Sequence, residues 1–213
     1  MTIPDSGYAS WMLAILPQID QSNLYNSWNS NHAHYDPSNV TTVRSIVAEY
    51  LCPDDLWSQE KYYSFAAPPG ECQMAFSSYV GSLGSNFIVD YFDWGPGIVP
   101  DGVLYRQSRV RTADIADGTS HTLLVGERVH VSALLRPVWA YGFTGKVVAD
   151  SSGGIHTGDY PHPHWSFSSF HPTGSQFALA DGSVRLLTRD VDAGFLSKLA
   201  TRAGQELDPD QSF

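Results

Sequence analysis

The feature of this sequence that most constrains its fold is a change in the spacing of its apolar residues. Near the start they recur at helical spacing, with Trp11, Ile15 and Ile19 on one face, and this spacing continues to about residue 51. From about residue 73 they form short β-branched or aromatic runs separated by Gly, Pro and Asp-Gly, which is typical of strands. Because helices come first and strands follow, the sequence predicts an α+β fold.

The length and punctuation of the chain indicate its organisation. A chain of 213 residues suits one domain, and no repeat of fixed period divides it. We expect a single domain over 1–213, with a helical part at about 8–51, a β-rich part at about 73–190 and a short helix at about 193–203. Asp181-Gly182, between two apolar runs, predicts a β-hairpin.

Charge and motif content exclude several classes of function. The net charge is −10, from 12 Lys and Arg against 22 Asp and Glu. Phosphate contacts need clustered cations, so nucleic acid is not an expected partner. The sequence has no Gly-rich phosphate-binding motif and no Gly-x-Ser-x-Gly motif. We therefore expect neither a nucleotide partner nor a serine nucleophile elbow.

The longest apolar stretch near the start is too short to cross a membrane. Trp11–Ile19 contains Pro17, and no basic segment precedes it. It therefore does not resemble a secretory signal either. An exported protein would carry its signal upstream of residue 1 or would have lost it; the alternative is that the protein is not exported.

The chain has two cysteines, Cys52 and Cys72. An even number of cysteines in an acidic, Ser- and Tyr-rich chain predicts a disulfide and an oxidising, extracellular compartment. Such a bond would stabilise the fold by roughly 3 kcal/mol. The alternative is a pair of buried free thiols.

A group of histidines is a candidate transition-metal site. His156, His162 and His164 offer imidazole nitrogens, and the His-x-His spacing would place two rings on one face of a strand. Pro161 and Pro163 flank this pair, however, so the alternative is a solvated loop.

A polar turn provides a second metal candidate. Asp114 and Asp117 precede Gly118 and offer carboxylates for Ca²⁺, although the spacing is not that of an EF-hand. The alternative is a turn or helix cap in which these side chains bond to backbone. Glu127, farther along, is expected to form an ion pair with an arginine such as Arg111.

Three residues are predicted to shape turns around the hairpin. His171 is expected to bond to backbone in a tight corner, while Asp181 and Gly182 tolerate the left-handed conformation that a hairpin turn requires. The sequence Asn39-Val40-Thr41 is an N-glycosylation signal in a predicted loop, so Asn39 is a candidate glycan acceptor.

Several segments together resemble the DUF1559 family, also called SBP_bac_10, of secreted pilin- or pseudopilin-like proteins in planctomycete-type bacteria. EYLCPDD is similar to the family's "FLCPSD" element, and ADGTSHTLLVGER is similar to its "TDGTSNTLLVGE" core. The remaining resemblance lies in the following segments, in order: SWMLAILPQIDQSNLYNSWN, SSYVGSLGSN, SSFHPTGSQFALADGSVRLLT and LATRAGQE.

The resemblance implies a pilin-like architecture, in which an N-terminal helix, or two, packs on an antiparallel sheet with long loops. It implies a non-enzymatic structural subunit at the cell surface that forms filaments through lateral contacts between copies. The apolar helix with which such subunits usually begin has no counterpart in residues 1–213. Two other functions remain open: a monomeric surface-tethered module that binds glycans or peptides, and a metal-dependent hydrolase using the cluster of histidines from His156 to His171.

Overall fold

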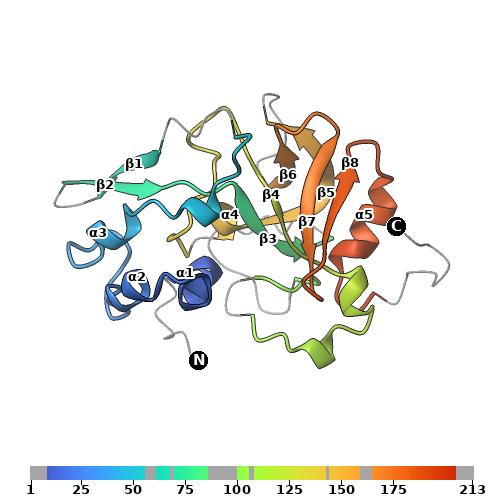
Figure 1. Cartoon of the computed structure of the whole chain (residues 1–213), viewed down its shortest axis with the longest axis horizontal. Coiled ribbons are helices and arrows are strands. Elements are labelled where there is room, and N and C mark those ends of the chain that lie inside the picture. The colour runs from blue at the N-terminus through green and yellow to red at the C-terminus, as the bar shows by residue number, and fades with distance from the viewer. Residues whose placement is uncertain are drawn as a thin grey trace.

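The structure is a computed structural model that describes residues 9–55, 61–67, 70–85, 100–105, 108–142, 144–158 and 165–204. It is an α+β fold, as predicted. The N-terminal helices and a small hairpin lie on one side of Figure 1, and a larger sheet with the C-terminal helix lies on the other.

The N-terminal part consists of short helical segments. They are α1 (Trp11–Ile15), the 3-10 turn η1 (Leu16–Ile19), α2 (Ser22–Asn26), α3 (Val40–Val43) and the 3-10 turn η2 (Ala48–Tyr50). Ser10 caps α1 by accepting a hydrogen bond from the Leu13 amide, and Asp20, with a φ of 61°, ends η1 in the left-handed conformation. The residues up to about 51, which have apolar residues at helical spacing, therefore form several short helical segments and not one long helix.

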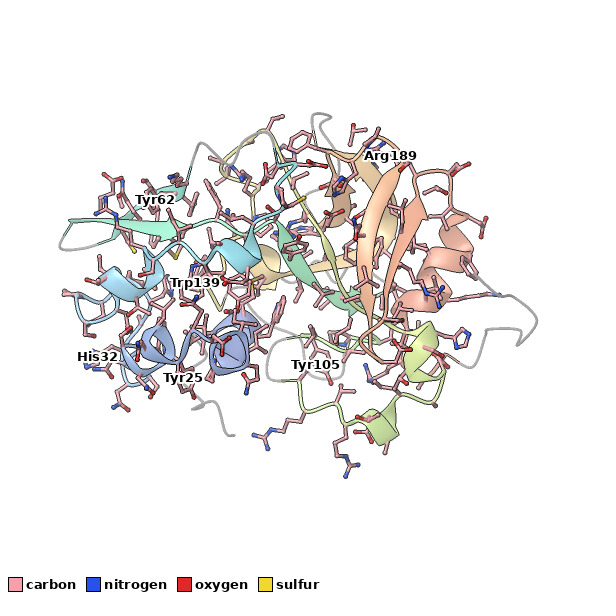
Figure 2. All side chains as sticks on the ribbon, in the orientation of Figure 1. Tyr25, His32, Tyr62, Tyr105, Trp139 and Arg189 are labelled. Carbon is pink, nitrogen blue, oxygen red and sulfur yellow. The ribbon has the colours of Figure 1, made fainter. Side chains whose placement is uncertain are left out.

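The second helical stretch breaks because a tertiary contact uses its backbone. Val47 is extended and separates α3 from η2. The Ser45 carbonyl lies in this break and accepts a hydrogen bond of 2.9 Å from the Trp139 indole. Trp139, labelled in Figure 2, is fully buried beside the N-terminal helices. In a continuous helix the Ser45 carbonyl would accept a hydrogen bond within the helix, and the sequence pattern did not reveal that the distant Trp139 indole would take its place.

The β-rich part contains a small hairpin and a larger mixed sheet. The hairpin pairs β1 (Tyr62–Ala67) with β2 (Gly70–Ala75). The larger sheet has the order β6-β5-β3-β4-β7-β8 among the described residues. Its strands are β3 (Tyr79–Gly84), β4 (Leu123–Glu127), β5 (Val148–Thr157), β6 (Ser166–Ser169), β7 (Gly174–Leu179) and β8 (Val184–Thr188).

The larger sheet is not wholly antiparallel, which corrects the sequence-based expectation. β3 pairs in parallel with β5, and β5 pairs in parallel with β6, whereas the β3–β4, β4–β7 and β7–β8 pairs are antiparallel. Between β3 and β5 the chain forms η3 (Thr112–Asp114), η4 (Thr119–His121), the strand β4 and α4 (Thr144–Val147). The parallel pairing of β3 with β5 therefore uses a long connection that itself contributes a strand to the sheet.

The predicted hairpin at Asp181-Gly182 is confirmed. It joins β7 to β8, and Phe177 lies opposite Arg185 in the antiparallel register. Gly182 has a φ of 87°, and the Asp181 carboxylate accepts hydrogen bonds from the amide and hydroxyl of Ser183. Both residues therefore have the structural turn role expected of them.

The C-terminal helix, rather than the N-terminal ones, covers the larger sheet. α5 (Ala193–Ala200) buries Leu196 and Leu199 in a cluster that includes Phe167 and Phe177 of the sheet. Its predicted position at about 193–203 is confirmed, with an end three residues earlier. The N-terminal helices pack mainly on β2 and residues 138–140. Trp11 links these regions, since its indole donates to the Val147 carbonyl at 2.8 Å.

No helix in the described part of the chain is both long enough and apolar enough to cross a membrane.

Candidate functional site

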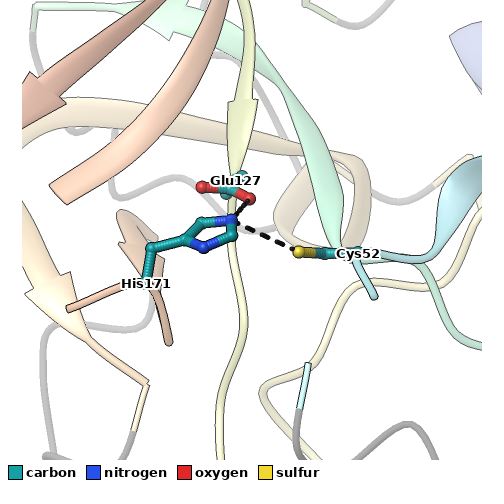
Figure 3. A group of neighbouring side chains, drawn as sticks. All are labelled: Cys52, Glu127 and His171. Atoms are coloured by element: carbon teal, nitrogen blue, oxygen red, sulfur yellow. Dashed lines mark hydrogen bonds and ion pairs between the residues drawn. The ribbon is translucent and has the colours of Figure 1, made fainter. Parts of the chain in front are cut away.

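A thiol, a carboxylate and an imidazole converge between the N-terminal region and the larger sheet. Cys52, Glu127 and His171 each point a ligand atom to one place, and these atoms lie within 4.8 Å of one another. Figure 3 shows one ring nitrogen of His171 directed at both other side chains: its Nε2 atom lies 3.1 Å from Glu127 Oε1 and 3.5 Å from Cys52 Sγ. Cys52 and Glu127 are buried, whereas His171 is partly exposed.

Cys52 begins a tight turn that supplies contacts to both parts of the molecule. The turn Cys52–Asp55 is closed by a hydrogen bond of 3.0 Å from the Asp55 amide to the Cys52 carbonyl, with Pro53 at its second position. Asp54 reaches the ring of His171, and Asp55 forms a fully buried ion pair of 2.7 Å with Arg136. The turn therefore orients Cys52 and Asp54 toward the same imidazole.

Glu127 is the last residue of β4 and is held from several sides. It lies opposite Tyr79 of β3 in the antiparallel register. Its Oε2 atom accepts hydrogen bonds from the Gln176 amide at 2.8 Å and the Ser175 hydroxyl at 3.2 Å, both in β7. The expected ion pair with Arg111 is wrong, because Arg111 is exposed and bonds to Asp114 instead. The Glu127 carboxylate is thus fixed with Oε1 directed at His171.

His171 lies in the connection between β6 and β7. Its amide donates to the Ser169 hydroxyl at 3.1 Å, and the guanidinium of Arg189, labelled in Figure 2, donates to the carbonyls of Ser169, His171 and Pro172. The expected bond from the His171 side chain to backbone is wrong. Side chains of distant segments occupy both ring nitrogens instead.

Both nitrogens of the His171 ring face carboxylates. Nδ1 lies 2.9 Å from Asp54 Oδ2, and Nε2 lies 3.1 Å from Glu127 Oε1. A neutral imidazole has one N–H donor and one lone pair, so it satisfies only one of these contacts. Both become favourable when the ring is an imidazolium, or when a metal cation lies between Nε2 and Glu127.

The surroundings of Cys52 favour the neutral thiol in the absence of a nearby metal cation. Burial, followed by the negative charge of Glu127, raises the pKa of the Cys52 thiol to about 11. Burial also raises the pKa of Tyr79, next to Cys52, to about 12, with Cys52 and Glu127 adding to the effect. Reactive cysteines have lowered pKa values instead. The electrostatics of the cluster therefore do not favour a thiolate nucleophile, whereas a bound dication would stabilise the thiolate.

The predicted disulfide is not present in the structure, where Cys52 and Cys72 are both free and buried. Cys72 lies in β2 and packs in the N-terminal apolar cluster. Cys52 instead directs its sulfur toward His171. The even cysteine count was therefore misleading, because the two thiols have different surroundings.

The structure gives the calcium candidates separate structural contacts. Asp114 bonds to the backbone and guanidinium of Arg111 in a reciprocal capping arrangement. Asp117 accepts hydrogen bonds from the Thr201 hydroxyl and the Gly204 amide, tying this turn to the end of α5. The two carboxylates do not belong to the group of converging metal-type ligands found in the described part of the chain.

The histidine candidates are only partly described. His156 lies in β5, opposite Ser168 of β6. His162 and His164 lie outside the described residues.

Asn39 is fully buried, which makes it unsuitable as a glycan acceptor in the folded domain. Its side-chain nitrogen donates to the carbonyls of Asn29, His32 and Ala33, and its oxygen accepts from the Asn29 amide. This correction has a clear cause, because the amide group holds the loop before α3 together.

Sequence reasoning did not bring Cys52, Glu127 and His171 together, since they come from three distant segments. A signal was nevertheless present: each lies in a segment that resembles the family, namely EYLCPDD, LLVGER and SSFHPTG. The described geometry is that of an α+β domain in which a Cys–Glu–His group, with only its histidine partly exposed, lies between an N-terminal helical region and a mixed sheet.

The family of the chain follows from its match to a family model. Residues 2–194 match SBP_bac_10, a protein of unknown function (DUF1559), and the chain belongs to this family. No curated protein and no solved structure matches the chain. The family description carries no biochemical activity, so any function must be argued from the molecule.

Proposed function

We propose that this protein is a non-enzymatic structural subunit, exported to the cell surface, that associates laterally with copies of itself into a filament or related assembly. Membership of the DUF1559 family and its resemblance to pilin-like proteins support the proposal. The observation that carries it is the exposed apolar surface of β8, the last strand in the order of the larger sheet.

Two large apolar side chains of β8 face solvent. Val184 is 60% exposed and Leu186 is 52% exposed. They are two residues apart and therefore share one face of the strand, while Leu187 on the other face is buried in the cluster that contains α5. Among the described strands, β8 pairs only with β7. An exposed edge strand with apolar side chains is a ready contact for another chain.

A second copy of the chain is the proposed occupant of this edge. The protein has a net charge of −10 but only 16% charged residues. Contacts through apolar side chains and strand backbone would avoid bringing many carboxylates together. Because each side chain is already about half covered, burying the rest of Val184 and Leu186 would contribute roughly half of the 1.5–3 kcal/mol of full burial, or about 1 kcal/mol each.

The proposal is tested by measuring the mass of the purified chain over a range of concentrations, followed by electron microscopy. We expect species larger than the 23.4 kDa chain and, at high concentration, ordered fibres. Val184→Lys with Leu186→Lys should shift the population to monomer. Leu134→Lys is the matched control, since Leu134 is 62% exposed and belongs to the segment between β4 and α4 rather than to β8.

A monomer at every concentration, or equal behaviour of the β8 and Leu134 variants, would contradict assembly through this edge. That result would favour the monomeric glycan- or peptide-binding module instead. Such a module could contact its ligand through aromatic side chains of loop-like segments, and Trp57, Tyr91, Phe92 and Trp94 of these lie outside the described part of the chain. Within it, Phe65 stacks on Tyr63 and Tyr141 and so serves packing.

A further inference from the structure

We propose that Cys52, Glu127 and His171 form a binding site for a divalent transition metal, with Zn²⁺ as the expected ion. The site shares only His171 with the histidine cluster that the sequence suggested, and it goes beyond the proposed role in assembly. Thiolate, imidazole and carboxylate are the groups that bind Zn²⁺ in proteins. A thiolate ligand favours such a softer ion over Ca²⁺ or Mg²⁺.

The spacing of the ligand atoms fits a tetrahedral ion. Zn²⁺ binds sulfur at about 2.3 Å and nitrogen or oxygen at about 2.0–2.1 Å, which places tetrahedral ligands roughly 3.3–3.6 Å apart. The Nε2–Sγ separation is 3.5 Å and the Nε2–Oε1 separation is 3.1 Å. Small side-chain movements would therefore bring the ligand atoms to bonding distance.

The residues that hydrogen-bond to His171 and Glu127 already orient these two side chains as a metal site needs. Asp54 lies 2.9 Å from Nδ1 of His171, so a proton on Nδ1 leaves the lone pair of Nε2 directed at the proposed ion. A carboxylate on the far nitrogen is the usual partner of a metal-binding histidine. On the other side, the Gln176 amide and the Ser175 hydroxyl hold the second oxygen of Glu127.

A dication also explains how the three groups coexist. A thiolate and a carboxylate buried together repel each other, while a neutral imidazole has no proton to offer both Asp54 and Glu127. One Zn²⁺ would balance the two anionic ligands and replace the missing proton at Nε2. The side chains of His171 and Asp54 are 20% and 65% exposed, so the ion can enter from solvent at this side.

The direct test is metal titration of the full chain after treatment with a chelator. Calorimetry with Zn²⁺ should give one site per chain. Co²⁺, used in place of Zn²⁺, should give the intense near-ultraviolet absorption of a cobalt–thiolate bond and the visible bands of a tetrahedral ion. No saturable binding, or saturable binding without the thiolate absorption, would overturn the proposal.

Variants then assign the ligands. Cys52→Ser and His171→Asn should each weaken Zn²⁺ binding by more than about 100-fold, and Asp54→Asn by about 10–100-fold. Cys72→Ala is the matched control, because it removes the other buried thiol and should keep the full Co²⁺ spectrum. Loss of the cobalt–thiolate absorption in Cys72→Ala but not in Cys52→Ser would refute the assignment.

Folding is checked by circular dichroism. If Cys52→Ser does not fold, the spectra of the wild-type chain and Cys72→Ala still decide between binding and no binding at Cys52. This readout is independent of assembly, so a failure of the metal proposal and a failure of the proposed function are distinguishable.

Discussion

The burial of His34 predicts a specific loss of stability in acid. The side chain is 4% exposed and lies against the rings of Tyr35, Phe65 and Tyr141, with the Tyr141 ring centroid 4.3 Å away. Burial in these surroundings lowers the pKa of His34 from 6.5 to about 4. The folded protein therefore holds this imidazole neutral at pH values where an unfolded chain would protonate it.

The sign and size of the effect follow from these two pKa values. Between pH 6.5 and about 4, the unfolded state binds a proton at His34 that the folded state does not, so the free energy of unfolding falls as the pH falls. Above pH 6.5 this loss is absent, and below about pH 4 it is complete. At about 1.4 kcal/mol for each pKa unit, the full loss is about 3 kcal/mol.

The assay is urea unfolding of the wild-type chain and His34→Leu at several pH values from about 7.5 to about 4, where other groups titrate in both proteins alike. As the pH falls, the unfolding free energy of the wild-type chain should decrease by about 3 kcal/mol relative to that of His34→Leu. His32→Leu is the control for removing an imidazole from an exposed position, since 50% of the His32 side chain is accessible. A difference between wild type and His34→Leu that stays constant with pH would refute the reasoning.

Two further predictions concern packing and backbone. Arg136→Met should lower the free energy of unfolding in urea by about 3–5 kcal/mol, because it leaves the fully buried Asp55 carboxylate without its ion-pair partner. Adding Asp55→Leu should recover much of this loss. A small effect of Arg136→Met alone would contradict the reasoning. Gly182→Val should lower the thermal midpoint and destabilise the fold by roughly 1–2 kcal/mol, because φ is 87° at this position. Gly70→Ala should leave the thermal midpoint nearly unchanged, because Gly70 has open space around it and no positive φ. Equal effects of these two glycine substitutions would exclude backbone strain as the cause.

The elements predicted well from sequence are those specified by neighbouring residues. The β7–β8 hairpin follows from alternating apolar residues on either side of Asp181-Gly182. α5 follows from a short helical pattern, with Asp192 at its start accepting a bond from the Phe195 amide. In both cases the interactions that form the element lie within a few residues.

The features that sequence missed depend on distant contacts. The parallel pairing of β5 with β3 and β6 leaves no local pattern, since buried parallel and antiparallel strands read alike. The cluster was missed for the same reason, and the even cysteine count directed attention to a disulfide with Cys72. Only the fold shows that Cys52 faces Glu127 and His171.

The turn at Cys52–Asp55 has a consequence for the order in which the chain acquires its structure. Its contacts reach 119 residues ahead to His171 and 81 residues ahead to Arg136. Contacts of such long range close large loops and slow folding, whereas the β7–β8 hairpin needs only its own residues. As the chain leaves the ribosome, the Cys52–Asp55 turn can therefore complete these contacts only after Arg136 and His171 have been made.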